Sequence, residues 1–129
     1  MDNSRRSFLA LIGMAAVATA SQQALGQDFD LGHIWQVREH EPDGSVWEGT
    51  WTRRGVSMIF DAEWRNSYTG GIARDVIEYR GLQNGSVVLY RYRQAGYYNG
   101  PLSRDGTRIR HGSATWYGAG NFWEAQILD

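Results

Sequence analysis

Short runs in which apolar and polar residues alternate recur along this chain from residue 33 onward, and turn-forming residues separate them. In the clearest run, 56–64, Met58, Phe60 and Trp64 fall on one face, whereas Asp61 and Glu63 fall on the other. A period of two is typical of a β-strand with one buried face. We therefore expect strands at eight runs: 33–40, 46–53, 56–64, 72–80, 86–94, 97–102, 107–116 and 122–128.

The connections between these runs are too short for parallel pairing, which needs a crossover of about a dozen residues or more. Glu41-Pro42-Asp43-Gly44 and Ser103-Arg104-Asp105-Gly106 are typical of type I turns, and Asn84-Gly85 is a strong hairpin signal. An open meander leaves two exposed edges, which closure removes. The sequence predicts an all-β, antiparallel up-and-down meander of about eight strands closed into a small barrel, with a two-sheet sandwich as the alternative.

The run 107–116 breaks the alternation. Strict alternation would place Arg108, Arg110 and Trp116 together on one face, which mixes charge with core. A β-bulge at Gly112-Ser113 would shift the phase by one residue and turn Ile109 inward with both arginines outward. We predict that bulge.

The N-terminus carries a different signal. Ser4-Arg5-Arg6-Ser7-Phe8-Leu9 resembles the twin-arginine export motif, with Arg5 and Arg6 as its arginine pair. A weakly apolar run, 9–20, follows and ends in the small-x-small cleavage pattern Ala18-Thr19-Ala20. This run is shorter than the roughly 20 apolar residues that span a bilayer, so we expect no stable membrane span after cleavage.

These features predict two segments. Residues 1–26 form a twin-arginine-type signal peptide, with a helix and a polar leader, and residues 27–129 form one β-barrel domain. Export in the unfolded state is the alternative to the twin-arginine route, which carries folded proteins. Either route predicts a periplasmic or secreted protein.

The composition of the chain limits which partners it can bind and which cofactors or metals it can hold. The chain has six Trp and seven Tyr but no Cys, so no disulfide supports the fold and aromatic rings must supply much of a small core. A formal net charge of −1 argues against nucleic-acid binding. No Gly-rich phosphate loop joins a strand to a helix, and His33, His40 and His111 lack a metal-ligand spacing. We expect no cofactor, no metal site and no catalytic residue.

One stretch of the chain resembles a known family. Gly49-Thr50-Trp51-Thr52, with Ser57 six residues after the tryptophan, is similar to the first-strand segment of the avidin-like biotin binders, a branch of the calycin-like barrels. Trp116 and Trp123 are similar to the ligand-stacking tryptophans of their closing strands. The resemblance implies a ligand-binding barrel in which Arg53 and Ser57 match positions that hold the ureido group of biotin. Arg53 replaces the asparagine of that family, which points away from biotin itself.

The leading hypothesis is an exported, non-enzymatic module that binds a small apolar or ring-containing ligand. Seven residues would line its site: Trp51, Arg53, Ser57, Tyr90, Tyr92, Trp116 and Trp123. The alternative for the tryptophans is that their rings fill the barrel.

Two other functions stay open. The chain could be a protein-interaction partner in the cell envelope, an inhibitor or an accessory subunit, that uses the loops 65–71 and 94–101. A small hydrolase ranks last. Ser57, His111 and Asp61 are the residue types of a catalytic triad, but nothing in their spacing indicates that they lie together.

Six arginines are expected on the outer face of the barrel. There they would form a cationic stripe for phosphate, sulfate or carboxylate groups, or they would pair with acids such as Asp75 and Glu78. They are Arg74, Arg80, Arg91, Arg93, Arg108 and Arg110.

Overall fold

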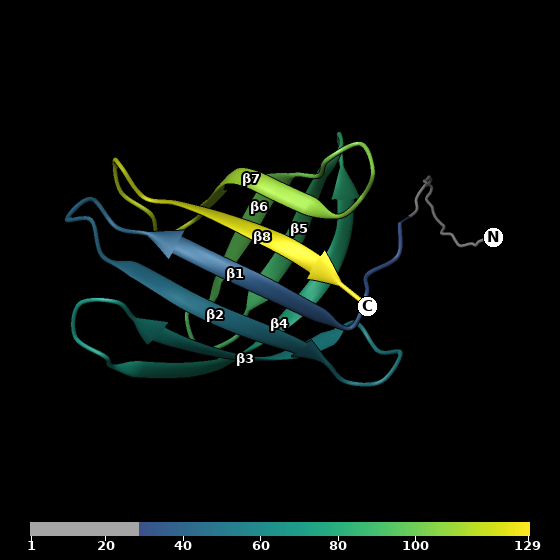
Figure 1. Cartoon of the computed structure of the whole chain (residues 1–129). Coiled ribbons are helices and arrows are strands. Elements are labelled where there is room, and N and C mark those ends of the chain that lie inside the picture. The colour runs from purple at the N-terminus through teal and green to yellow at the C-terminus, as the bar shows by residue number, and fades with distance from the viewer. Residues whose placement is uncertain (1–28) are drawn as a thin grey trace. The chain divides into compact units, whose positions relative to one another are not determined.

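The computed structural model describes residues 29–129, so the predicted signal peptide, with its helix and its export motif, lies outside the described residues. Eight antiparallel strands follow one another in chain order and close into a barrel (Figure 1). They are β1 (Ile34–His40), β2 (Val46–Arg53), β3 (Ile59–Asn66), β4 (Ile72–Gln83), β5 (Ser86–Arg91), β6 (Gly96–Pro101), β7 (Arg108–Ala114) and β8 (Phe122–Leu128). The predicted up-and-down barrel is confirmed, and the sandwich alternative is wrong. Within residues 29–129, no helix is long and apolar enough to cross a membrane.

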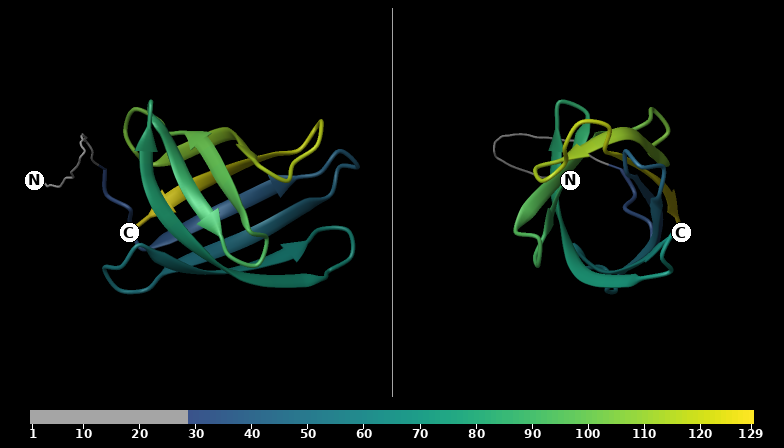
Figure 2. Two further views of the ribbon diagram at one scale, coloured as in Figure 1. Left: turned by 180° about the vertical axis from the view of Figure 1, so that it is seen from behind. Right: turned by 90° about the vertical axis from the view of Figure 1, so that its left-hand side faces the viewer.

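The barrel closes through β1 and β8, as the end-on view in Figure 2 shows. Ile34 pairs with Leu128 at one end of this ladder and His40 pairs with Phe122 at the other. On its other edge β1 pairs with β2 over the same residues. Each strand therefore has two neighbours, and the barrel has no free edge.

The turns follow the sequence signals. The amide of Gly44 donates to the carbonyl of Glu41 at 3.0 Å, and the amide of Gly106 donates to the carbonyl of Ser103 at 3.0 Å. Asn84 and Gly85 both have positive φ, 52° and 80°, as a two-residue hairpin loop of type I′ requires. Asparagine and glycine are the residues that tolerate this conformation best.

The third strand starts later than the alternation predicts. It begins at Ile59, because residues 54–58 form a tight loop in which the amide of Arg54 donates to the carbonyl of Ile59 at 2.8 Å. Val56 is 89% exposed and does not belong to the core face. The expectation of a strand from Val56 is wrong, because apolar residues in a loop happened to continue the period. β4 also runs on to Gln83, and β5 ends at Arg91.

The predicted bulge in β7 is confirmed, although it begins slightly earlier than expected. The register of β7 against β8 shifts between Ile109 and Gly112, and His111 adopts a positive φ of 52°. Ile109 is fully buried while Arg108 and Arg110 are exposed. The shift thus removes both guanidinium groups from the barrel interior.

Aromatic rings fill the middle of the barrel. The Trp51 ring centroid lies 5.7 Å from that of Trp35, 6.2 Å from that of Trp64 and 5.9 Å from that of Trp123. All four indoles are at most 2% exposed. For Trp51, Trp64 and Trp123, the inward orientation that the alternation predicts is confirmed.

Glycine lets these rings approach the strands. A Cβ atom at Gly49 would lie 2.5 Å from Cδ1 and 2.7 Å from Nε1 of Trp64, which is closer than van der Waals contact allows. We expect Gly49→Ala to lower the free energy of unfolding by about 1–3 kcal/mol, because a rigid indole cannot move aside in a filled interior. Urea denaturation followed by circular dichroism measures this change.

Gly118→Ala is the matched control, because its Cβ atom would lie 3.7 Å from the nearest heavy atom beyond its immediate neighbours. A Gly49→Ala variant as stable as Gly118→Ala would contradict the close packing of Trp64 on β2.

Candidate binding site at one end of the barrel

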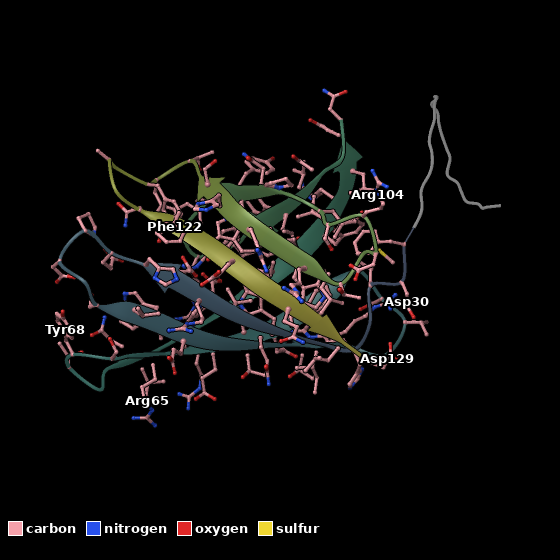
Figure 3. The ribbon with its side chains drawn as sticks, turned by 45° about the horizontal axis from the view of Figure 1, so that its top comes forward. Asp30, Arg65, Tyr68, Arg104, Phe122 and Asp129 are labelled. Atoms are coloured by element: carbon pink, nitrogen blue, oxygen red, sulfur yellow. The ribbon has the colours of Figure 1, made fainter. Side chains whose placement is uncertain are left out.

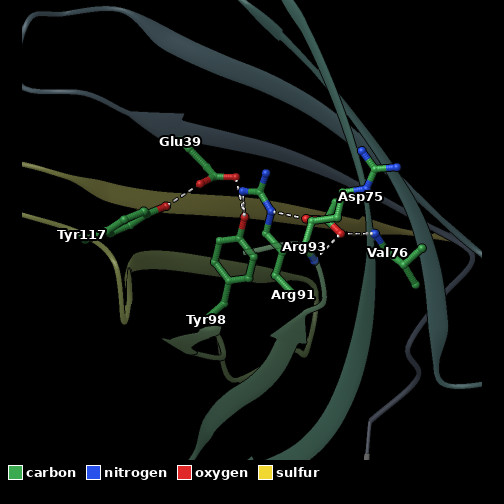
Figure 4. A network of polar contacts seen from close by, with 7 residues as sticks. All are labelled: Glu39, Asp75, Val76, Arg91, Arg93, Tyr98 and Tyr117. Atoms are coloured by element: carbon green, nitrogen blue, oxygen red, sulfur yellow. Dashed lines mark hydrogen bonds and ion pairs between the residues drawn. The ribbon is translucent and has the colours of Figure 1, made fainter. Parts of the chain in front are cut away.

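Four loops, at 41–45, 67–71, 92–95 and 115–121, join strands at one end of the barrel, which we call the Pro42 end. A network of polar side chains lies inside the barrel near this end (Figure 4). Its members come from four strands and one loop: Glu39 from β1, Asp75 from β4, Arg91 from β5, Tyr98 from β6 and Tyr117 from the loop 115–121.

Glu39 is the acceptor at the centre of this network. Its carboxylate accepts a hydrogen bond from the Tyr98 hydroxyl at 2.8 Å and another from the Tyr117 hydroxyl at 2.7 Å. Glu39 is only 5% exposed, because it follows Trp35 and Val37 on the inner face of β1 at the period of two. Glu39 is not among the seven site residues predicted from the sequence, although the alternation of β1 identifies it as an inward residue.

Arg91 contacts Asp75 directly and is connected to Glu39 through the hydroxyl of Tyr98. Its Nε donates to Asp75 at 2.8 Å, and one terminal nitrogen donates to the Tyr98 hydroxyl at 3.1 Å. Its guanidinium carbon lies 4.2 Å from the centroid of the Trp64 ring and 5.5 Å from that of Trp116. These distances suit cation–π contacts with both rings.

The expectation that Arg91 belongs to an outer stripe of arginines is wrong. Its side chain is 15% exposed, and the side chain of its partner Asp75 is 1% exposed. Arg91 shares the inner face of β5 with Val87 and Leu89, which are both fully buried. The ion pair compensates for the cost of placing a charge on this face.

Asp75 also fixes the backbone where β4 meets the end of β5. Its second carboxylate oxygen accepts hydrogen bonds from the amides of Val76 at 2.7 Å and Arg93 at 3.0 Å. The Asp75 carboxylate therefore joins the charge of Arg91 to two backbone donors, and it holds the guanidinium in a defined position.

The low-dielectric interior shifts the acidities of these groups. Burial raises the pKa of Glu39, although the Tyr117 and Tyr98 hydroxyls oppose this effect by hydrogen-bonding to the carboxylate. Burial, followed by the nearby charge of Glu39, raises the pKa of Tyr98 and also that of Tyr117. Both tyrosines consequently remain neutral hydrogen-bond donors at ordinary pH.

Burial by itself lowers the pKa of Arg91. The surrounding oxygen atoms, that of Tyr98 first, raise it more, so the pKa of Arg91 lies above its ordinary value and the guanidinium stays charged. A charged donor is thus held close to two indole rings, those of Trp64 and Trp116.

Two indole N–H groups inside the barrel have no acceptor of good hydrogen-bond geometry among the described residues, those of Trp51 and Trp64. The Trp64 N–H still lies close enough to Glu39 to lower its pKa slightly. The indole of Trp123 differs, because it donates to the carbonyls of Ser113 at 2.9 Å and Asn99 at 3.1 Å.

The structure brings three of the seven predicted site residues together around Tyr98. The centroid of the Tyr98 ring lies 5.2 Å from those of Trp51 and Trp123, and 4.9 Å from that of Trp116. Trp51 and Trp123 are fully buried, whereas Trp116 is half-buried at the Pro42 end. Trp116 is therefore the one of these three that solvent reaches.

Arg53 and Ser57 lie at the other end of the barrel. The Arg53 guanidinium donates to the backbone carbonyls of Ser57 at 2.7 Å and Val56 at 3.0 Å, so it closes the loop 54–58. The hydroxyl of Ser57 is exposed and accepts a hydrogen bond from the amide of Ile59 at 3.1 Å. These two residues do not join the tryptophans.

Tyr90 and Tyr92 lie on the outer face of β5 and the turn that follows it. Their ring centroids are 5.0 Å apart, and Tyr97 of β6 lies 4.9 Å from Tyr90. The Tyr92 hydroxyl donates to Glu78 at 2.7 Å, and the Arg80 guanidinium lies 4.9 Å from the Tyr90 centroid. These aromatic rings form a separate surface group that the barrel wall divides from Trp116.

Within the part of the chain that the structure describes, no three His, Asp or Glu side chains gather in a way that could hold a metal ion. Comparison of the chain with protein-family models, with curated proteins and with solved structures finds no significant match. The function is therefore inferred from the residues of this chain alone.

The raised pKa of Glu39 predicts a pH dependence of stability. The folded protein binds the Glu39 proton more tightly than the unfolded chain, so this group stabilises the fold at low pH. The contribution is lost as pH rises from about 4.5 through the raised pKa. We expect the stability of the wild type relative to Glu39→Gln to fall over this window, by at most about 1.4 kcal/mol per pH unit, the limit for one proton.

Urea denaturation of both proteins from pH 4 to pH 9 measures this difference, because the other carboxyl groups titrate in both. Tyr117→Phe removes a hydrogen bond that lowers the pKa of Glu39, so it should move the window to higher pH. A difference between wild type and Glu39→Gln that is constant with pH would rule out this account of Glu39.

Proposed function

We propose that this protein is an exported, non-enzymatic binding module that captures a small ring-containing ligand at the Pro42 end of its barrel. The observation that carries the proposal is the guanidinium of Arg91, which Asp75 and Tyr98 hold close to the rings of Trp64 and Trp116. A fixed charged donor flanked by aromatic rings is the arrangement that specific small-molecule sites use.

Arg91 has donors left for a ligand. A guanidinium carries five N–H groups, and two of those on Arg91 make the hydrogen bonds to Asp75 and Tyr98. Among the described residues, the Arg91 side chain makes no other hydrogen bond. A carboxylate or carbonyl oxygen of a ligand would meet the remaining donors, and its ring would stack on Trp116.

The packing supports a ligand site at the end of the barrel rather than at its centre. Trp51 and Trp123 occupy the middle of the barrel and contact each other and Tyr98, which supports the filling role for these two tryptophans. The half-buried Trp116 and Tyr117 therefore favour a site at the Pro42 end over one at the centre.

Two sequence features support the same proposal. The similarity of residues 49–52 to the avidin-like binders supports a binding role, and the twin-arginine-like pair Arg5 and Arg6 supports a site of action in the periplasm or outside the cell.

Tryptophan fluorescence tests the site directly. We expect saturable quenching by an aromatic acid such as benzoate or cinnamate, and much weaker quenching by neutral benzamide. Arg91→Lys keeps the charge beside Asp75 but loses the planar fork, so it should weaken binding about tenfold or more. Trp116→Phe should remove most of the quenching signal.

Arg93→Lys is the matched control, because the same exchange is made two residues away at an exposed side chain. If no aromatic acid quenches saturably, or if the two lysine variants bind equally well, Arg91 is not the ligand contact.

A second candidate function is a protein-interaction partner in the cell envelope. It is favoured by the group of tyrosines on the outer face, since Tyr92 is 46% exposed, Tyr97 is 40% exposed and Arg80 lies over the neighbouring ring. Tyrosine and arginine carry much of the binding energy in protein interfaces. An envelope protein that co-purifies with the wild type and with Arg91→Lys, but not with Tyr92→Ser/Tyr97→Ser, would favour this candidate. A monomer without such a partner would count against it.

A further inference from the structure

A groove of about 750 Å³ lies on the outside of the barrel, and the network inside the barrel does not contribute to it. Figure 3 looks onto this side, where β8 is the yellow strand and β1 the blue strand beside it. The residues along its floor are paired across four strands: Gly49 of β2, Val37 of β1, Ala125 of β8 and Ile109 of β7.

Two rows of outward side chains form the walls of the groove. The strand register places them on either side of the floor residues, about 7 Å apart along each strand. One row consists of Arg65, Glu48, Arg38 and Glu124, and the other consists of Thr50, Gln36, Gln126 and Arg108. Arg110 lines the groove where the β7 bulge begins. Because the groove crosses four strands at about 4.8 Å each, its floor is roughly 15 Å long.

The charges in the groove are only partly compensated. Four arginines and two glutamates line it, although the whole chain has a net charge of −1. Glu48 lies 3.8 Å from Arg38, and Glu124 is 2.8 Å from His40. The groove therefore carries more positive than negative charge, with Arg65 at its β3 end and Arg108 and Arg110 at its β7 end.

At that end, Arg108 and Arg110 flank the floor residue Ile109. Among the described residues, neither guanidinium makes a hydrogen bond or an ion pair, and Arg108 acts only at a distance on Asp105. The bulge at His111 helps to keep both side chains outside the barrel. Two uncommitted guanidinium groups on either side of Ile109 are suited to hold one carboxylate, sulfate or phosphate group between them.

The rest of the groove offers neutral hydrogen-bonding groups. The amides of Gln36 and Gln126 face each other across β1 and β8, and Thr50 adds a hydroxyl. Amides and hydroxyls match the alternating donors and acceptors of sugar hydroxyls. No aromatic side chain lines the groove, so it lacks the rings on which nucleobases would stack.

We infer that this groove binds an acidic oligosaccharide. One acidic group lies between Arg108 and Arg110, and the neighbouring sugar rings lie along Gln126, Gln36 and Thr50. A floor of roughly 15 Å accommodates about three sugar units. The inference does not depend on the proposed function, because the groove and the Arg91 site lie on opposite faces of the barrel wall.

Titration calorimetry of the full domain with trigalacturonate at low salt tests this inference. We expect binding that weakens at least tenfold in Arg108→Gln/Arg110→Gln and that also weakens as salt is added, since exposed charges are screened. Arg74→Gln/Arg104→Gln removes the same charge elsewhere and should leave binding within twofold. Arg91→Lys should also leave it unchanged, so this test is separate from that of the aromatic-acid site.

Two further ligands test the sugar contacts. Gln36→Ala/Gln126→Ala should weaken the binding of trigalacturonate at least fivefold and leave the binding of inorganic phosphate unaffected. Neutral maltotriose should bind to the wild type far more weakly than trigalacturonate. If the wild type does not bind trigalacturonate, or if Arg74→Gln/Arg104→Gln weakens it as much as Arg108→Gln/Arg110→Gln, the inference is wrong. If phosphate binds as tightly as trigalacturonate, the groove holds an anion alone and the assignment to an oligosaccharide is overturned.

Discussion

Strand β1 hydrogen-bonds to β2 along one edge and to β8 along the other, and the rest of the structure depends on this double pairing. Seven consecutive residues, Ile34 to His40, have a partner on both sides. The pairing with β8 closes the barrel, and closure is what creates an interior in which Trp35, Val37 and Glu39 become buried. Without the pairing of β1 with β8, the inner face of β1 would be open to solvent, and Glu39 would be an ordinary exposed acid.

The interior combines a filled aromatic centre with a charged end, and the two parts have different energetic roles. Burial of the indole rings supplies stabilisation in proportion to the apolar area removed from water. Burial of Glu39, Asp75 and Arg91 costs free energy. The ion pair of Arg91 with Asp75 and the hydrogen bonds from Tyr98 and Tyr117 to Glu39 offset this cost only in part. A small barrel gains little stability from such a network. Its value lies in holding Arg91 at one position, and that favours a binding role.

The alternation showed which residues share a face, but it could not always show which face is inside. On β1, β2 and β8 the faces differ clearly in polarity, so Trp51 and Trp123 could be placed from the sequence, and the bulge in β7 followed from the need to keep Arg108 outside. β5 was harder to interpret, because both of its faces carry large residues. Tyr90 is outside and Arg91 is inside because Asp75, sixteen residues earlier, supplies the compensating charge. An ion pair between two strands, such as that of Arg91 with Asp75, depends on how the strands are aligned. The sequence of either strand alone does not show this alignment.

The two proposed binding surfaces are linked through the backbone that separates them. On β1, Glu39 points into the barrel while Gln36 and Arg38 point into the outer groove, and the alternation of a strand allows no other division. A slip of one residue in the β1–β8 ladder would exchange the faces, so that Arg38 would enter the core and Glu39 would meet solvent. One register therefore positions the residues of both proposed sites, and a one-residue slip is disfavoured because it would bury the charge of Arg38. The same alternation lets a single layer of strands separate the buried network of Glu39, Asp75 and Arg91 from an outer groove lined by four arginines and two glutamates.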